Sequence, residues 1–547
     1  MAHLPIDDVL PALRDALFRR DDVVLEAPPG AGKTTRVPLA LLQEPWLAGQ
    51  TILMLEPRRL AARAAAARLA AQLGEQPGET AGYRVRLDSR VGPSTRIEVV
   101  TEGILVRRLQ DDPALDGVGL VIFDEFHERS LDADLALALV LSARQLLRDT
   151  PLKLLVMSAT LEGERLATLL DQAPVIRSSG RLYPVSLHWG SPWQPGERPD
   201  SRVVACVLQA LAQQSGSLLV FLPGQAEIRR VQTLLAEALA GRPEILLCPL
   251  HGELVLAGQQ QAIDPAPPGQ RKVVLATNIA ETSLTIDGVQ VVIDAGLARV
   301  PRFDPGSGMT RLETRRISRA SATQRAGRAG RLGPGHCYRL WSEAQHAQLQ
   351  AHGEPEILQA DLAGLVLQLA RWGMAPDELL WLDAPPAAAC AQARELLVRL
   401  GALQPEGGLL TAHGQAMATL PLPPRLAHLL LVGQALGQVA LAAQLAALLS
   451  ERDLRRDCGA DLALALQAPS SPQVRQLARQ FRQLLPERGP ADSGSVLADG
   501  DGPAVLLALA WPQRIARPGP YTQLRAHETG RNLVCRLPLY KQTHYLF

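Results

Sequence analysis

Short apolar segments alternate with longer segments of helical character through the first 185 residues of the chain. The apolar segments are rich in Val, Ile and Leu, as is typical of strands that are buried on both faces. This alternation predicts βαβ units and a parallel sheet covered by helices. The predicted strands are VVLEA (23–27), TILMLEP (51–57), IEVVT (97–101), VGLVIFDE (118–125) and LKLLVMSAT (152–160).

The same pattern restarts after residues 192–199, a Pro-rich segment that is typical of a linker. Two successive α/β domains are therefore expected, at residues 1–190 and 191–350. The predicted strands of the second domain are SLLVFLPG (217–224), EILLCPLHG (244–252), KVVLATN (272–278) and VQVVIDAG (289–296).

Ala- and Leu-rich helical sequence replaces the strands from about residue 352. We expect helices with a small wing at residues 407–414 in a domain of residues 351–425, and a helical bundle in residues 426–515. Residues 516–547 change abruptly in composition and form an atypical tail. We expect this tail to be a shortened or frame-shifted end that does not pack as a domain.

The stretch Leu426–Leu449 contains no Asp, Glu, Lys or Arg, which makes it the best candidate for a membrane span. Three Gln residues interrupt it, and Gly433 and Gly437 predict a bend. Buried bundle helices are therefore favoured over a membrane segment.

Composition excludes some classes of protein. With 547 residues and a net charge of +1, the chain has no overall basic field, so any affinity for nucleic acid must come from local patches. The six Cys are scattered without a CxxC pair, which predicts neither a zinc site nor disulfides and favours a reducing cytoplasm. The first residues do not have the pattern of a signal peptide.

The segment APPGAGKTT (27–35) follows a predicted strand and precedes a predicted helix. Its glycines let backbone N–H groups surround phosphate oxygens, and its lysine neutralises their charge. Thr34 would supply a hydroxyl to Mg²⁺. A Gly-rich strand-to-helix turn without a ligand is the alternative, and Lys-Thr at the helix start favours the phosphate site. The residues expected to contact the nucleotide are Gly30, Ala31, Gly32, Lys33, Thr34 and Thr35.

Two adjacent carboxylates, Asp124 and Glu125, end the strand VGLVIF, and His127 follows them. The carboxyl ends of parallel strands form the edge where α/β proteins bind ligands. Asp124 is expected to hold Mg²⁺ with Thr34, and Glu125 to contact the metal site and polarise the attacking water. An acidic pair used only as a helix cap is the alternative, and the phosphate loop in the same sheet argues against it.

The segment QRAGRAGR (324–331) places Arg325, Arg328 and Arg331 three residues apart, which predicts that they project from one side of a helix or tight turn. Arg328 and Arg331 are expected to reach the γ-phosphate, and Gln324 to orient water. A solvated basic face is the alternative. Residues 299–318 predict two strands around a Pro-Gly-Ser-Gly turn.

This set and order of motifs resembles the DEAH-box group of superfamily 2 helicases, over about residues 20–450. Further matching segments are EPRRLAAR (56–63), TEGILVRRL (101–109), FLPGQAEI (221–228), SAT (158–160) and ATNIAETSLTI (276–286). The sequence has Phe126 where the family's DEAH motif has Ala, and it is most similar to the HrpB-type bacterial members. Position 126 supplies no catalytic group.

The resemblance implies an ATP-dependent RNA helicase with two RecA-like domains, followed by winged-helix and ratchet-like helical domains. It implies Mg²⁺, 3′-to-5′ translocation on single-stranded or partly duplex RNA, and a strand-separating role for the hairpin of residues 299–318. It places Asp287 near the ribose and Arg68 beside the base, with Ile263 where the family has an aromatic residue. Weak nucleobase selectivity is expected. The resemblance assigns the hydrolysis chemistry to Glu125, His127, Gln324, Arg328 and Arg331. It assigns contacts with the nucleic-acid backbone to Arg58, Arg59, Thr101, Gly224, Thr277 and Asn278.

Two other readings remain open. The second α/β domain and the segment 324–331 argue against a small-molecule P-loop kinase. A truncated helicase that binds nucleotide and nucleic acid without productive unwinding is the alternative to a working motor. A cytoplasmic monomer is expected, and the sequence identifies no protein partner.

Overall fold

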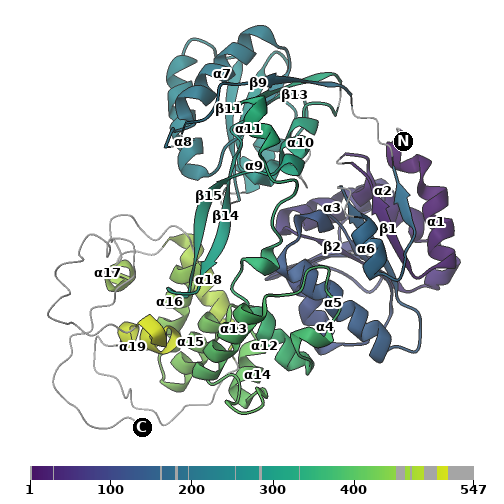
Figure 1. Ribbon diagram of the computed structural model, residues 1–547, viewed down its shortest axis with the longest axis vertical. Helices are drawn as coiled ribbons and strands as arrows, with labels where there is room; N and C mark the ends of the chain where they lie inside the picture. Colours follow the sequence, from purple (N-terminus) through teal and green to yellow (C-terminus); the bar gives the residue numbers. More distant parts are fainter. Residues whose placement is uncertain are drawn as a thin grey trace. The chain divides into compact units, whose positions relative to one another are not determined.

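The structure is a computed structural model that describes residues 3–28, 30–159, 163–178, 183–194, 196–252, 254, 256–281, 286–331, 333–450, 462–467, 471–485 and 502–514. It divides into two compact units (Figure 1). The first contains residues 1–303, 310–360 and 379–384, and the second contains residues 304–309, 361–378 and 385–547. The predicted tail, residues 516–547, lies outside the described part of the chain.

The first α/β domain is built on an eight-stranded sheet with the order β4-β3-β5-β2-β6-β7-β1-β8. Its strands pair in parallel except for β3 and β4, which are antiparallel. All five predicted strands are confirmed, because each is a short apolar segment buried between helices. The strands are β1 (Asp22–Glu26), β2 (Thr51–Glu56), β3 (Ala81–Val85), β4 (Asp88–Arg90), β5 (Ile97–Thr101), β6 (Val118–Phe123), β7 (Lys153–Ser158) and β8 (Val175–Arg177).

Six helices belong to this sheet in the described residues, and they are labelled in Figure 1. The core packs Val23, Leu25, Ile52 and Met54 of β1 and β2 against apolar residues of the neighbouring helices. The helices are α1 (Leu10–Arg19), α2 (Lys33–Leu41), α3 (Arg59–Leu73), α4 (Glu102–Asp111), α5 (Leu131–Leu146) and α6 (Gly163–Leu169).

The second α/β domain has a six-stranded parallel sheet with the order β11-β12-β10-β13-β16-β9. All four predicted strands are confirmed. The strands are β9 (Val185–Trp189), β10 (Ser217–Phe221), β11 (Ile245–Leu250), β12 (Arg271–Ala276), β13 (Val289–Asp294) and β16 (Gly335–Arg339), and the helices are α7 (Asp200–Gln213), α8 (Gln225–Ala238), α9 (Leu256–Ile263), α10 (Arg319–Gly327) and α11 (Glu343–Ala347).

Strand β9 changes the expected domain boundary. It pairs in parallel with β16, with Val185 opposite Gly335 and Trp189 opposite Arg339. The second sheet therefore begins before residue 190, the expected end of the first domain. The Pro-rich segment 192–199 follows β9 and is a connection inside the second domain.

The predicted hairpin is confirmed as β14 (Leu297–Asp304) and β15 (Met309–Arg316), which form a separate two-stranded sheet. Its turn is held by Asp304, whose carboxylate accepts hydrogen bonds from the Gly306 N–H (3.1 Å) and the Ser307 hydroxyl (2.7 Å).

Helices dominate the remainder. Leu403 and Leu410 form an isolated antiparallel bridge that overlaps the expected wing. The stretch Leu426–Leu449 is two helices, α15 and α16, separated where Gly437 adopts a φ of 72°. No described helix is long and apolar enough to cross a membrane. The helices are α12 (Ala363–Trp372), α13 (Ala387–Arg399), α14 (Ala412–Thr419), α15 (Pro424–Ala435), α16 (Val439–Ser450), α17 (Leu462–Gln467), α18 (Pro472–Gln483) and α19 (Gly502–Ala510).

Candidate nucleotide and nucleic-acid site

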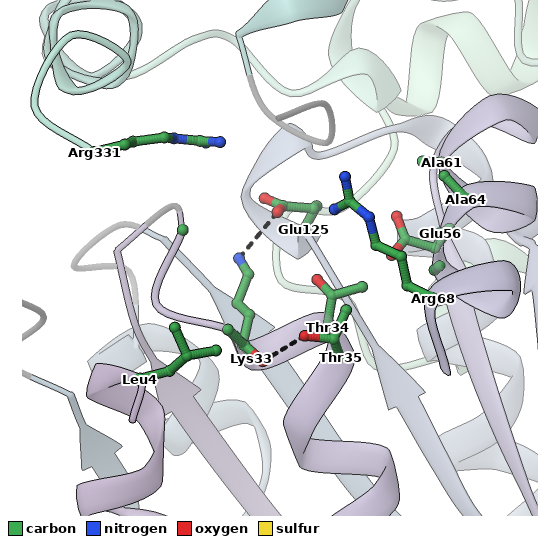
Figure 2. A pocket seen from close by; sticks show the side chains of 13 residues that line it. Leu4, Lys33, Thr34, Thr35, Glu56, Ala61, Ala64, Arg68, Glu125 and Arg331 are labelled. Carbon is green, nitrogen blue, oxygen red and sulfur yellow. Dashed lines mark hydrogen bonds and ion pairs between the residues drawn. The ribbon is translucent and has the colours of Figure 1, made fainter. Parts of the chain in front are cut away.

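A cavity lies at the carboxyl edge of the first sheet, where β1 leads through the Gly-rich loop into α2 (Figure 2). Gly30 and Gly32 have φ values of 85° and 97°, a left-handed conformation that favours glycine. Gly32 directly precedes α2, so the amino end of this helix faces the loop. A helix N-terminus next to such a loop is a favourable site for phosphate.

Lys33 is the first residue of α2, and its side chain is buried between two carboxylates. Its Nζ lies 3.2 Å from Glu125 Oε1 (Figure 2). The same atom lies 3.5 Å from Asp124 Oδ1. Burial disfavours the charged ammonium, but the two carboxylates outweigh burial and raise the pKa of Lys33. The lysine therefore stays charged at neutral pH at the place where a phosphate would bind.

Asp124 contacts Thr34, which lines the cavity. The Thr34 hydroxyl donates to Asp124 Oδ2, and the Glu125 N–H donates to Asp124 Oδ1 (2.8 Å). Burial raises the pKa of Asp124, and nearby Lys33 opposes that rise. A hydroxyl beside a carboxylate is an oxygen donor set that fits Mg²⁺, which binds through one or two protein groups when phosphates and waters complete its shell.

Glu125 and His127 form a second polar pair. Glu125 has a φ of 51°, which turns its side chain out of the strand direction after β6. Burial opposes its ionisation, but Lys33 and then His127 lower the pKa of Glu125 to about 2. His127 Nε2 lies 3.3 Å from Glu125 Oε2, and its Nδ1 accepts from the Ala159 N–H (3.2 Å). Burial lowers the pKa of His127, so the ring is neutral.

That hydrogen bond connects the end of β6 with the predicted SAT segment, residues 158–160, at the end of β7. Thr160 lies outside the described residues, so the expected coupling through its hydroxyl stays a prediction.

The three arginines of residues 324–331 have three different surroundings, contrary to the expectation that they project from one side. The reason is that α10 ends at Gly327, so the helical spacing does not continue to Arg331. Arg325 is 1% exposed and donates to Glu281 Oε2 and Asp294 Oδ1, each at 2.9 Å, inside the second domain. Arg328 donates through Nε to the Glu281 carbonyl oxygen (2.9 Å).

Of these three arginines, Arg331 lines the cavity, together with the phosphate loop (Figure 2). A Cβ placed on Gly30 would lie 3.5 Å from Arg331 Nε, so the guanidinium is directly above the loop. Burial lowers the pKa of Arg331 to about 10, which still leaves it charged at neutral pH. Burial also lowers the pKa of Arg328, and Arg331 adds to that shift.

The remaining predicted nucleotide contacts divide into two groups. Arg68 of α3 lines the cavity, as do Thr34 and Thr35. Gln324, Ile263 and Asp287 are not among the described residues that line it. The last two are neighbours, because the Asp287 N–H donates to the Ile263 carbonyl oxygen (3.3 Å).

The predicted nucleic-acid residues occupy the ends of strands or the starts of helices. Arg58 Nη1 donates to the Asn278 carbonyl oxygen (3.3 Å), and its Nη2 lies 3.0 Å from Glu128 Oε2. This contact joins the two α/β domains through residues from two of the predicted motifs. The N-caps of α4, α8 and the short helix at 278–280 are Thr101, Gly224 and Thr277, respectively. Arg59 is the first residue of α3. Arg59 and Asn278 are both exposed.

Five residues that line the cavity were not predicted from the sequence, namely Leu4, Glu56, Ala61, Ala64 and Ala65. Glu56 ends β2 and is 2% exposed, and burial followed by the charges of Asp124 and Glu125 raises its pKa well above its usual value. The signal was present, because Glu56 follows an apolar run as Asp124 does. Leu4 packs on Gly32, and the Ile6 N–H donates to the Ala31 carbonyl oxygen (3.1 Å). Nothing in the local sequence predicted that contact.

Comparison with known proteins agrees with this geometry. Residues 9–169 match the DEAD/DEAH box helicase family, and residues 202–333 match the helicase conserved C-terminal domain. The chain therefore contains the two conserved domains of a DEAD/DEAH box helicase and belongs to that family.

Within the family, the chain is similar to the ATP-dependent RNA helicase HrpB of Escherichia coli strain K12. The two are 51% identical over 518 residues, which is 94% of this chain and 62% of HrpB. A crystal structure of the E. coli DEAH/RHA helicase HrpB matches with a TM-score of 0.84 and 50% identity, over 95% of this chain and 64% of that one.

A more distant relative is the pre-mRNA-splicing factor ATP-dependent RNA helicase prp22 of Schizosaccharomyces pombe. It is 36% identical over 444 residues, or 79% of this chain and 37% of that protein. The chain thus spans about three fifths of HrpB and a smaller share of prp22.

Proposed function

We propose that this chain is an ATP-dependent RNA helicase that couples hydrolysis of ATP to 3′-to-5′ movement on single-stranded RNA and to duplex unwinding. The observation that carries the proposal is a cavity lined by Lys33 and Glu125 with Arg331 above them (Figure 2). Asp124 contacts the same lysine from behind the cavity wall. Phosphoryl transfer requires these elements: a cation on the phosphates, an acid for the metal, an acid for the water and an arginine for the developing charge.

Each residue has a distinct part in hydrolysis. Lys33 and the N–H groups at the start of α2 bind the phosphates, and Thr34 and Asp124 hold Mg²⁺. When bound, Mg²⁺ neutralises the charge that develops on the phosphate oxygens. Glu125, ionised at neutral pH, orients the attacking water and accepts its proton. His127 fixes the Glu125 side chain from one side, and Arg331 stabilises the charge on the transferred phosphoryl group.

RNA contacts are assigned to the residues at the strand ends of both α/β domains, from Arg58 and Thr101 to Thr277 and Asn278. Binding through strand ends and helix N-termini is directed at the sugar-phosphate backbone, so little sequence specificity and a strong dependence on salt are expected. The hairpin β14–β15 is assigned the strand-separating role. We also propose that the protein is a cytoplasmic monomer. The free thiols of Cys206, Cys248, Cys337 and Cys390 support the reducing compartment.

The test is steady-state hydrolysis of Mg-ATP by the purified chain without nucleic acid, with single-stranded RNA and with single-stranded DNA. Strong stimulation by RNA supports a coupled motor. Glu125→Gln should still bind nucleotide but lose about 10²–10⁴-fold in turnover, because the base that receives the water proton is gone. A near-normal rate in that variant would contradict the assignment of Glu125.

A protein that binds nucleotide and RNA without unwinding is the second candidate, because the cavity and its charged residues account for nucleotide binding but not for strand separation. A helicase assay with a fluorescent duplex that carries a 3′ single-stranded extension separates the two. RNA-stimulated hydrolysis without strand separation supports the second candidate. Strand separation that requires ATP hydrolysis excludes it.

A further inference from the structure

Glu56 differs from other buried carboxylates of the first sheet. Glu26, at the end of β1, accepts from the Gly163 N–H (2.9 Å) and from Arg177 Nε (2.8 Å). Glu98, in β5, is paired with Arg84 Nε (2.8 Å) and Arg108 Nη1 (2.9 Å). Glu56 is more deeply buried than either, yet its Oε2 has no hydrogen-bond partner within the described residues.

The sheet places Glu56 beside the predicted metal acid. Strand β2 lies between β5 and β6, with Glu56 opposite Thr101 and Leu55 opposite Phe123. The Asp124 N–H donates to the Leu55 carbonyl oxygen (3.1 Å). Glu56, the last residue of β2, and Asp124, the residue after β6, therefore lie on adjacent strands at the same edge of the sheet. Glu56 lines the cavity together with Thr34 and Thr35 (Figure 2).

A buried carboxylate oxygen without a partner destabilises a fold unless a ligand completes its hydrogen bonds. The ligand has to donate, and phosphate oxygens do not. Mg²⁺ gives up its waters reluctantly and keeps several of them when it binds at a nucleotide site. Waters on a divalent cation are strong donors, and three carboxyl groups, Glu56, Asp124 and Glu125, gather around the single ammonium of Lys33, where a dication would supply the missing positive charge.

We propose that Glu56 is a further residue of the metal site, which accepts a hydrogen bond from a water bound to the nucleotide-associated Mg²⁺. This inference rests on the proposed function, because it requires Mg-nucleotide in this cavity. Glu56 acts through that water and is not a direct ligand, so its removal weakens Mg²⁺ binding without removing the phosphate contacts of Lys33.

The experiment is binding of a fluorescent ADP to the full chain, once in EDTA and once across a Mg²⁺ titration. In Glu56→Gln, which keeps the shape but cannot ionise beside a bound cation, the Mg²⁺ concentration at half-maximal effect should rise about tenfold, because an amide oxygen accepts a weaker hydrogen bond from a metal-bound water than a carboxylate does. Binding in EDTA should stay as in the wild type. Glu98→Gln is the matched control from the adjacent strand, and its Mg²⁺ midpoint should not move.

Three results would overturn the inference. The first is an unchanged Mg²⁺ midpoint in Glu56→Gln. The second is an equal loss of ADP binding in EDTA, which would mean that Glu56 contacts the nucleotide itself. The third is a lower thermal unfolding midpoint of Glu56→Gln, which would mean that Glu56 has a structural partner. Glu56→Asp, which keeps the charge with a shorter reach, should give a smaller shift than Glu56→Gln. Wild-type binding that does not respond to Mg²⁺ would overturn the proposed function as well, which distinguishes the two failures.

Discussion

Each α/β domain contains a buried cation that contacts two carboxylates of its own domain, and these two clusters differ in how complete they are. In the second domain, Arg325 makes hydrogen bonds of 2.9 Å to both Glu281 and Asp294, and its guanidinium lies 4.8 Å from the centre of the Phe221 ring. In the first domain, Lys33 lies 3.2 and 3.5 Å from its carboxylates, at the wall of a cavity.

This difference separates a structural charge from a functional one. The planar guanidinium of Arg325 has its donors directed at protein acceptors, which fixes the end of β13 to α10. The ammonium of Lys33 has three donors and only long contacts, so it keeps capacity for a phosphate oxygen. We expect substitutions in the first cluster to change activity and substitutions in the second to change stability.

Arg331 breaks this division, because it comes from the second domain and lines the cavity of the first. Arg331→Ala should lower the turnover of ATP by about 10³–10⁵-fold, the usual effect of losing an arginine that stabilises the transferred phosphoryl group. The free energy of unfolding should stay close to that of the wild type. Turnover at saturating ATP and a denaturant titration measure the two quantities.

The control for Arg331→Ala is Arg229→Ala, which removes an exposed arginine of the same domain and should leave both quantities unchanged. If Arg331→Ala hydrolysed ATP at the wild-type rate, the second domain would contribute no arginine to the chemistry.

Lys33→Arg tests the first cluster with its charge retained. The guanidinium can still pair with Asp124 and Glu125, so stability should change little. It cannot reproduce the compact ammonium among the phosphates, and kcat/KM should fall about 10²–10³-fold. Lys153→Arg is the matched control, since Lys153 is also buried and pairs with Asp21 (2.8 Å) away from the cavity. Normal hydrolysis by Lys33→Arg would show that any cation suffices there.

Arg325→Lys is the reciprocal change in the second cluster. An ammonium cannot donate to Glu281 and Asp294 in the same geometry, which leaves a buried carboxylate short of a partner. The free energy of unfolding should fall by about 1–3 kcal/mol. Arg230→Lys, which alters a partly exposed arginine paired with Asp200, should cost no more than about 1 kcal/mol. Urea unfolding of both variants measures these free energies. If Arg325→Lys were fully folded but had lost ATP hydrolysis, the purely structural role of Arg325 would be contradicted.

The sequence predicted those parts of the fold and site that depend on local pattern. Short apolar segments identified nine strands, whereas β16, with the sequence GHCYR, has no apolar run and β9 is an edge strand with partly exposed residues. The phosphate loop was predictable because glycines, lysine and threonine are adjacent. The different roles of Arg325, Arg328 and Arg331 could not be predicted, because their surroundings depend on where α10 ends. Glu56 was overlooked because its missing partner is a fact of packing that no short motif records.

The buried acid Glu102 extends the comparison to a group of the first domain outside the cavity. Its carboxyl group accepts a hydrogen bond from the Ser130 hydroxyl. Burial raises the pKa of Glu102 from 4.5 to about 8. The hydrogen bond from Ser130 opposes this rise, and the nearby charges of Asp132, Glu128 and Glu356 add to it. The folded chain therefore holds a proton that the unfolded chain releases at lower pH. Its contribution to stability is complete below pH 4.5, declines as the pH rises towards 8, and is constant above that.

Glu102→Gln should remove this dependence, because the amide is neutral at every pH. Relative to the wild type, the variant should gain at most about 1.4 kcal/mol for each pH unit between about 4.5 and 8. Denaturant midpoints of the two proteins at several pH values in this window measure the gain. If the plots of midpoint against pH stay parallel for the two proteins, Glu102 is ionised in the folded state. In that case its buried charge is compensated by its surroundings, as the charge of Arg325 is compensated by Glu281 and Asp294.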